Sequence, residues 1–153
     1  TRNRLGVLYA RYGMYDEAES QFRRAVRARD YVPALVNLGN VALLRDDIAE
    51  AREAYERVLA QDEDNEAALL GIARVAYEDE DYGAAEEAHA RLAAADPELA
   101  ERFAYLSGGG SSSGRASDAG RLGSTVVWDE SVEVSSERDA AGGRTEPTGG
   151  LLQ

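Results

Sequence analysis

The sequence predicts an all-α solenoid, built from helix-turn-helix units that repeat about every 34 residues. The pair Leu5-Gly6 returns as Leu38-Gly39 and then as Ile72-Ala73, and Leu106-Ser107 begins a fourth set. Two further sets keep the same spacing of 33 and then 34 residues, one of small side chains and one of ring-bearing side chains: Ala18, Ala51 and Ala85, and Phe22, Tyr55 and His89. Because all three sets share one period, a single structural unit is repeated along the chain.

Large apolar, small and aromatic residues at these offsets resemble the tetratricopeptide repeat, and the resemblance covers residues 1–106. It implies three helix-turn-helix repeats, over about residues 1–31, 32–65 and 66–97, followed by a capping helix over 97–106. It also implies a right-handed solenoid whose concave inner wall binds another polypeptide. The function that follows from the resemblance is protein–protein interaction, as a scaffold or adaptor without catalytic activity.

The spacing of apolar residues predicts the individual helices of these repeats. They cover about residues 2–12, 15–29, 33–44, 48–60, 66–77 and 82–94. The capping helix is expected to cover the sixth helix, because an end repeat otherwise exposes its apolar stacking surface. We expect the large side chains of the repeat to lie in the core between helices: Leu5, Phe22, Leu38, Tyr55 and Ile72.

The first residue, Thr1, falls inside the first helix of the first repeat. We therefore expect the sequence to be a fragment of a longer protein, which leaves open whether a signal peptide or lipid anchor has been removed. Either a cytoplasmic or a periplasmic location fits this expectation, so the compartment stays open.

Composition and motifs argue against several other function classes. The net charge of −12 disfavours nucleic acid, which requires clustered positive charge, and no apolar run approaches the roughly 18 residues of a membrane helix. Cysteine is absent, and the acidic runs lack the glycine and glutamate spacing of a calcium loop. The single histidine, His89, stands at the aromatic position of the repeat, which favours packing over catalysis. We therefore expect no metal, no cofactor and no enzymatic activity.

The first helix of each repeat should supply the concave wall. Asn3 lies on this wall by register, and the residues that we expect to bind a peptide there are Arg11, Asn37, Asn40, Leu43, Leu44, Leu70, Arg74 and Tyr77. Asparagine can donate to and accept from a peptide backbone, and arginine pairs with carboxylates. Together with the apolar side chains, they predict a ligand that mixes apolar and acidic residues.

The C-terminal residues 107–153 differ from the repeats. They contain ten glycines and nine serines, so we expect a largely disordered acidic tail. Residues 124–134 are rich in β-branched side chains and predict a strand. This segment has the composition expected of a ligand for the wall, in the residues Val126, Val127, Trp128, Asp129 and Glu130. The linker over 107–123 has 17 residues, long enough for the segment to reach the wall of its own chain or of a neighbour.

Two other functions fit the same fold. Repeats that stack end to end or exchange tails would make the chain an oligomerisation module, with self-association through the tail. Alternatively, the repeats are an accessory domain of a larger enzyme. The segment 124–134 is also compatible with a short motif for another protein.

Overall fold

A computed structural model describes residues 1–29, 31–108 and 126–131 of the chain. The ordered elements of these residues are all helical, which confirms the predicted fold class. They are α1 (Arg2–Arg11), α2 (Tyr15–Ala28), α3 (Val32–Leu44), α4 (Ile48–Gln61), α5 (Glu66–Glu78), α6 (Tyr82–Ala95), α7 (Pro97–Arg102) and the short 3-10 helix η1 (Ala104–Ser107). The expected disorder of the tail concerns residues that lie outside the described ones, apart from 126–131.

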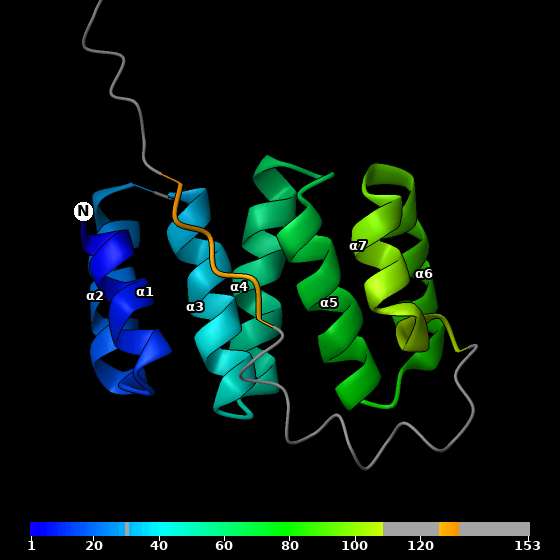
Figure 1. Ribbon diagram of the computed structural model, residues 1–153, viewed down its shortest axis with the longest axis horizontal. Coiled ribbons are helices and arrows are strands. Elements are labelled where there is room, and N and C mark those ends of the chain that lie inside the picture. The colour runs from blue at the N-terminus through cyan, green and yellow to red at the C-terminus, as the bar shows by residue number, and fades with distance from the viewer. Residues whose placement is uncertain (30, 109–125, 132–153) are drawn as a thin grey trace, which may run out of the picture.

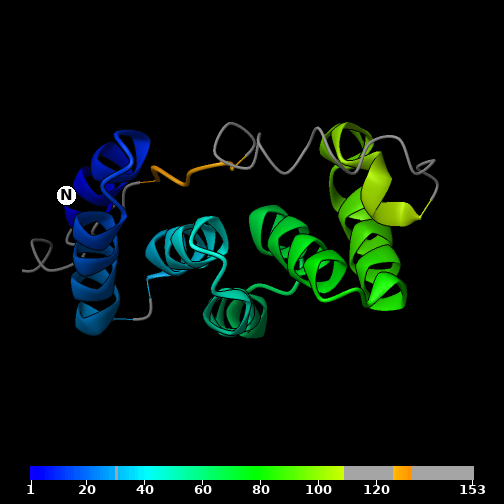
Figure 2. The same cartoon turned by 90° about the horizontal axis from the view of Figure 1, so that it is seen from below.

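Consecutive helices form hairpins that stack side by side in chain order (Figure 1). Within the hairpins, α1 packs on α2, α3 on α4 and α5 on α6, while α2 packs on α3 and α4 on α5 between them. Figure 2 shows the hairpins arranged in an arc, with residues 126–131 in orange on its inner side. The molecule is therefore a solenoid with a concave face.

Local signals set the helix boundaries. Side-chain oxygens of Asp47, Asn65, Asp81 and Asp96 accept hydrogen bonds from backbone N–H groups three residues later, which satisfies donors that a helix start leaves open. Each hairpin turn contains one residue with positive φ at the same repeat position: Gly13 (φ 74°), Asp46 (φ 61°) and Glu80 (φ 60°). The repeat period therefore extends to the backbone conformation of the turns.

The core consists of apolar clusters at the contacts between hairpins, and its large rings lie against glycine. Phe22 is fully buried, and a Cβ on Gly6 would lie 2.5 Å from its Cε1. Tyr55 lies between two helices in the same way, because a Cβ on Gly39 or Gly71 would come within 2.6 Å or 2.4 Å of its ring. These glycines let neighbouring helices approach around a shared aromatic ring.

Leu5 corrects one expectation, because it lies at the surface with 40% of its area exposed. Its repeat equivalent Leu38 is buried between α2 and α3, whereas no helix of the described chain packs on that side of α1. Burial at this repeat position requires a preceding second helix, which the first repeat lacks within the described residues.

The capping helix is also shorter than expected. A continuous helix over 97–106 was wrong, because α7 ends at Arg102 and Phe103 has φ −117° and ψ 33°, outside the helical region. The chain continues as η1, which buries Leu106, and Gly108 ends it with φ 73°. Phe103, Leu106 and Leu92 form one buried cluster, so α7 and η1 together cover α6.

Candidate peptide-binding groove

Residues 126–131 lie along the concave side of α3 and run antiparallel to it (Figures 1 and 2). Three backbone carbonyls of the segment accept hydrogen bonds in reverse order along the helix. Asn40 donates to Val127 O (2.9 Å), Asn37 donates to Asp129 O (2.8 Å), and the hydroxyl of Tyr31 donates to Ser131 O. We call the surface that faces the segment the groove; it is formed by residues of α1, α2, α3 and α5 and by Tyr31, which precedes α3.

Asn37 binds the backbone of the segment with both polar atoms of its side-chain amide. Its Nδ2 donates to Asp129 O at 2.8 Å, and its Oδ1 accepts from Asp129 N at 2.9 Å. The side-chain amide therefore contacts both polar groups of one residue, as a neighbouring strand would. Its second N–H donates to Oδ1 of Asn3 (2.8 Å), and Nδ2 of Asn3 in turn donates to Asp129 O (2.8 Å). Both asparagines are buried, so their amides are held by mutual contacts as well as by the segment.

Asn40 is oriented from behind by Tyr55. The Tyr55 hydroxyl donates to Asn40 Oδ1 at 2.6 Å, which leaves the Asn40 amide N–H groups directed at the groove. Tyr55 is fully buried, and this burial raises the pKa of its phenol, although the positive charge of Arg74 opposes the shift. The hydroxyl therefore stays protonated and remains a donor.

The hydrogen bonds skip every second residue of the segment. Residues two apart in an extended chain are about 6.6 Å apart, and a step of three to four residues along a helix covers about 5 Å. A peptide that crosses α3 obliquely can therefore place alternate carbonyls at Asn40 and Asn37. The side chains of the intervening residues, Trp128 and Glu130, are then available for other contacts.

The intervening side chains contact the first hairpin. Trp128 is half-buried, and its ring stacks on Phe22 with the centroids 6.4 Å apart and the planes at 21°. Glu130 forms an ion pair with Arg11 at 2.9 Å. Val127, on the other side of the segment, lines a small hollow whose walls come from α3, α4 and α5: Asn40, Tyr55, Ala67, Leu70, Gly71 and Arg74.

The residues predicted for the concave wall fall into two groups. Arg11, Asn37 and Asn40 contact the segment, and Leu70 and Arg74 line the hollow beside Val127. Leu43, Leu44 and Tyr77 form the second group, which does not contact the segment. Leu43 belongs to the buried core cluster between α3, α4 and α5, Leu44 is half-buried at the end of α3, and Tyr77 packs edge-on against Tyr82 and Tyr105.

The chemistry predicted for Arg74 also needs correction. It was expected at the wall as a partner for a carboxylate, but only 4% of its area is exposed. Its guanidinium lies over the ring of Phe103, 5.8 Å from the centroid. Arg74 therefore contributes to the contact between α5 and the capping elements.

Three contributors were not predicted as groove residues: Tyr31, Phe22 and Tyr55. Phe22 and Tyr55 occupy the aromatic core position, and only the hydroxyl of Tyr55 distinguishes it from a purely apolar ring. Tyr31 lies in the connection before α3, where no periodic pattern marks it. The predicted strand is not formed by residues 126–131, because asparagine side chains take the place of a second strand. The remaining residues of 124–134 lie outside the described part.

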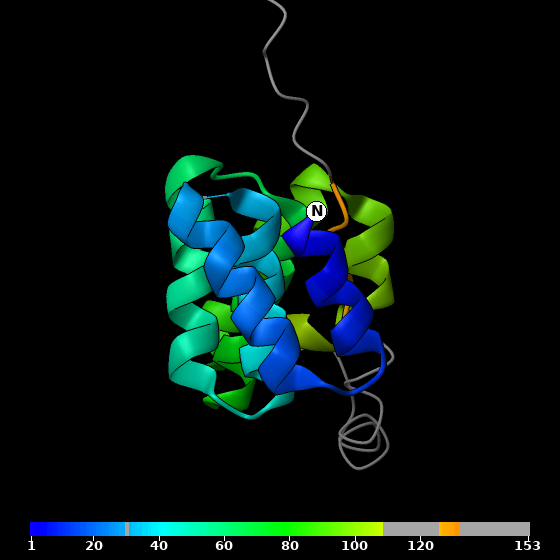
Figure 3. The ribbon, with the colours of Figure 1, turned by 90° about the vertical axis from the view of Figure 1, so that its left-hand side faces the viewer.

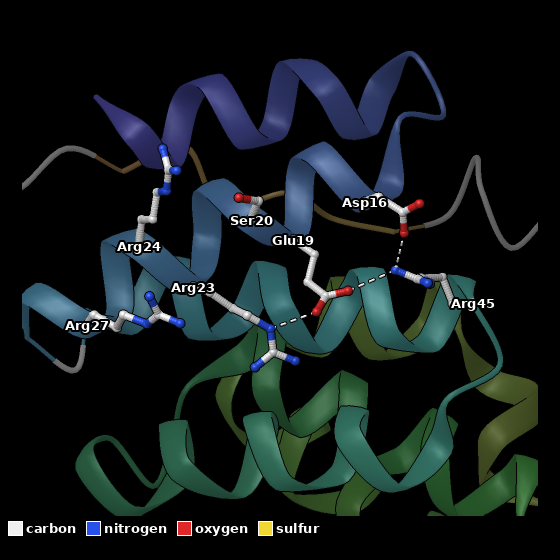
Figure 4. A pocket seen from close by; sticks show the side chains of 7 residues that line it. All are labelled: Asp16, Glu19, Ser20, Arg23, Arg24, Arg27 and Arg45. Carbon is white, nitrogen blue, oxygen red and sulfur yellow. Dashed lines mark hydrogen bonds and ion pairs between the residues drawn. The ribbon is translucent and has the colours of Figure 1, made fainter.

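A second hollow, of about 450 Å³, lies on α2 and shares no lining residue with the groove (Figure 4). Glu19 lies between two arginines there, accepting from Arg23 Nε at 2.6 Å and from Arg45 at 2.8 Å. Arg45 also pairs with Asp16 at 2.7 Å, so charges of both signs lie within the wall. The four arginines of the wall outnumber its two acidic residues, so the hollow is positively charged.

His89 makes a structural contact. Its Nε2 donates to the backbone carbonyl of Ala100 at 2.8 Å, which ties α6 to α7. Among residues 1–29, 31–108 and 126–131, no three acidic or histidine side chains are placed to hold a metal ion. In the same residues, every helix is too short or too polar to cross a bilayer.

Comparison with known families and proteins gives one clear result. The tetratricopeptide repeat family matches residues 1–30 and again residues 42–107. The comparison with curated proteins found no match for this chain. The two matched ranges cover α1 and α2 and the stretch from the end of α3 to η1. Repeats of this family generally mediate protein–protein interactions. The helical part of the chain therefore belongs to the tetratricopeptide repeat family.

Proposed function

We propose that this repeat domain binds an extended peptide in the groove, and that residues 126–131 are an internal ligand that competes with an outside one. The observation that carries the proposal is the pair of hydrogen bonds between Asn37 and the backbone of Asp129. Such a pair holds any residue except proline at that position, because it involves the backbone N–H and C=O of the ligand and no side chain. The groove would thus bind the peptide backbone through Asn3, Asn37 and Asn40 and select sequences at other points.

Three ligand side chains supply the selectivity. Trp128 gives the largest apolar contact, and aromatic side chains of this kind dominate the binding energy of many interfaces. Glu130 pairs with Arg11, and because both side chains are about half exposed, this pair contributes more to orientation than to affinity. Val127 faces the hollow between α3 and α5. We infer a ligand pattern of an aliphatic residue, an aromatic residue, any residue and an acidic residue, bound antiparallel to α3.

The test uses a fluorescent peptide with the sequence of residues 124–134 and the full chain. Trp128→Ala should weaken the internal ligand and leave the groove accessible, so this variant should bind the peptide more tightly than the unmodified chain. Adding Asn37→Ala to that variant should lower the affinity at least about tenfold, because two hydrogen bonds to the peptide are lost. Fluorescence anisotropy gives the dissociation constants.

Two controls separate groove binding from other effects. Ser20→Ala removes an exposed polar group on α2 and should leave the affinity of the Trp128→Ala chain unchanged. A peptide of the same residues in scrambled order should not bind, and circular dichroism should show equal helix content in all variants. Equal affinity with and without Asn37, or no preference for the ordered peptide over the scrambled one, would contradict the proposal.

A further inference from the structure

The outer side of α1 carries an apolar stripe at the N-terminal end of the solenoid. Leu5, Leu8 and Tyr12 follow a spacing of three and four residues, which places them on one side of the helix. Their exposed fractions are 40%, 51% and 77%. Figure 3 views the molecule from this end, where α1 (dark blue) and α2 lie in front of the other helices. We call Leu5, Leu8 and Tyr12 the α1 stripe.

The same repeat positions are covered at both inner junctions. Leu38 and Val41 correspond to Leu5 and Leu8 and are buried against the first hairpin, with exposed fractions of 7% and 1%. In the next repeat, Val75 is fully buried and Ile72 packs against the same core cluster as residues of α4. In both cases the covering element is the second helix of the preceding hairpin, α2 or α4. The α1 stripe is thus the third copy of a surface that elsewhere receives a helix.

Each inner junction also has an ion pair at the repeat position of Tyr12. Arg45, directly after α3, pairs with Glu19 of α2 at 2.8 Å, and Asp79, directly after α5, pairs with Arg52 of α4 at 2.5 Å. At each junction, one side chain of the covering helix therefore carries the charge opposite to the residue at this repeat position. At both inner junctions, this surface therefore combines a buried apolar stripe with an ion pair beside it.

The charge around the α1 stripe is positive. Helix α1 contains Arg2, Arg4 and Arg11 and no acidic residue. Residues 1–45 carry eight arginines and four acidic residues, whereas residues 46–108 carry five arginines and 18 acidic residues. The stripe therefore lies in the one basic region of an acidic chain, which favours an acidic partner.

We propose that the α1 stripe is a docking site for an acidic amphipathic helix, which packs on α1 as α2 packs on α3. A second copy of the same stripe is a poorer fit, because it would bring the exposed Arg2 and Arg4 of each α1 together. The opposite end of the solenoid, formed by α7 and η1, is also a poorer partner for the α1 stripe, because it offers no exposed large apolar side chain among the described residues. The exposed large apolar side chains of the described chain lie at other positions than α7 and η1: Leu5, Leu8, Tyr12, Met14, Tyr82 and Val127.

The probe for this site is a helix that already covers the equivalent surface. A peptide with the sequence of α4, residues 48–61, is stapled on its exposed side because a helix of 14 residues is marginal in water. Arg52→Gln and Arg57→Gln in the peptide leave its three glutamates as the only charges. We expect this peptide to bind the full chain, and a version with the glutamates replaced by lysine to bind at least about tenfold more weakly.

Variants of the full chain locate the site. Leu8→Glu should weaken binding of the acidic peptide at least about tenfold, because it puts a like charge into the stripe. Leu8 is half exposed, so the variant should fold, and circular dichroism checks this. Met14→Glu makes the same charge change at another exposed apolar residue, outside the stripe, and should leave binding unchanged.

Three results would overturn the proposal. They are equal binding of the acidic and basic peptides, equal binding to the chain with and without Leu8→Glu, and self-association of the chain that Leu8→Glu abolishes. The last result would identify a second copy as the occupant. The emission of Trp128 should not change when the acidic peptide binds, which separates this site from the groove.

Discussion

At the scale of single residues, Tyr55 joins the core to the groove. Its ring is enclosed by Gly39 and Gly71, and its hydroxyl orients the amide of Asn40. A phenylalanine would fill the same space but would leave Oδ1 of Asn40 without this donor. The tyrosine hydroxyl at this aromatic position is therefore explained by the groove and not by packing.

Tyr55→Phe should destabilise the fold by about 1–2 kcal/mol at pH 7, because a buried acceptor loses its partner. The difference in the free energy of unfolding between Tyr55→Phe and the unmodified chain should shrink above pH 10. Burial raises the pKa of Tyr55 above its ordinary value of 10.0, so the unfolded chain releases the phenolic proton first. Stability linked to this group is full below pH 10 and is lost as pH rises, by about 1.4 kcal/mol per pH unit.

Urea denaturation followed by circular dichroism at pH 7 and pH 11 measures this effect. The control is Tyr12→Phe, which removes a hydroxyl from a side chain that is 77% exposed and should leave the stability at pH 7 unchanged. A constant difference between Tyr55→Phe and the unmodified chain at both pH values would show that the phenol titrates normally in the fold.

At the scale of elements, the three hairpin turns share a backbone conformation that suits glycine. Gly13 has φ 74°, and a side chain there would meet no neighbouring atom within 4 Å. Gly13→Ala should therefore destabilise the chain by about 1 kcal/mol through backbone strain alone. Gly83→Ala, in the first turn of α6, makes the same change at a helical residue and should stabilise by about 0.5 kcal/mol. Thermal unfolding measures the change in Tm of both variants. If both changes had the same sign, the positive φ of Gly13 would not account for its effect on stability.

Most of the helices could be predicted from the sequence because their signals are local. Apolar spacing predicted the boundaries of α2 to α6 within one residue, and the capping contacts of Asp47, Asn65 and Asp81 fix three of these helix starts in the structure. The end of α7 could not be predicted in this way, because Phe103 leaves the helical region where its ring lies against Arg74 and Arg102. The exposure of Leu5 depends on which helix precedes the first repeat, and a single repeat pattern does not contain that information.

The groove could be predicted in part. The register places Asn3, Asn37 and Asn40 on the concave side, where they contact residues 126–131. The exact partners depend on how α1, α3 and α4 come together, so the contacts of Tyr31 and Tyr55 have no counterpart in the linear pattern. The role of all these residues in binding a peptide stays a prediction.

At the scale of the whole molecule, the contacts of residues 126–131 can form within one chain or between two chains. Residues 109–125 connect η1 to the segment, and 17 residues can span at most about 60 Å. A connection of this length gives the segment an effective concentration near the millimolar range at its own groove. At micromolar protein concentration, binding within the chain should therefore exceed exchange between chains by a large factor.

The emission of Trp128, the only tryptophan, measures this choice directly. In the full chain, we expect a blue-shifted spectrum that does not change on dilution, because a contact within one chain is independent of concentration. Asn37→Ala should shift the spectrum to the red at every concentration, since it removes both hydrogen bonds to Asp129. A spectrum of the unmodified chain that turns red on dilution would indicate tail exchange between chains, and the repeats would then act as an oligomerisation module. A red spectrum at all concentrations would show that the segment leaves the groove in solution, and the internal-ligand part of the proposal would be wrong.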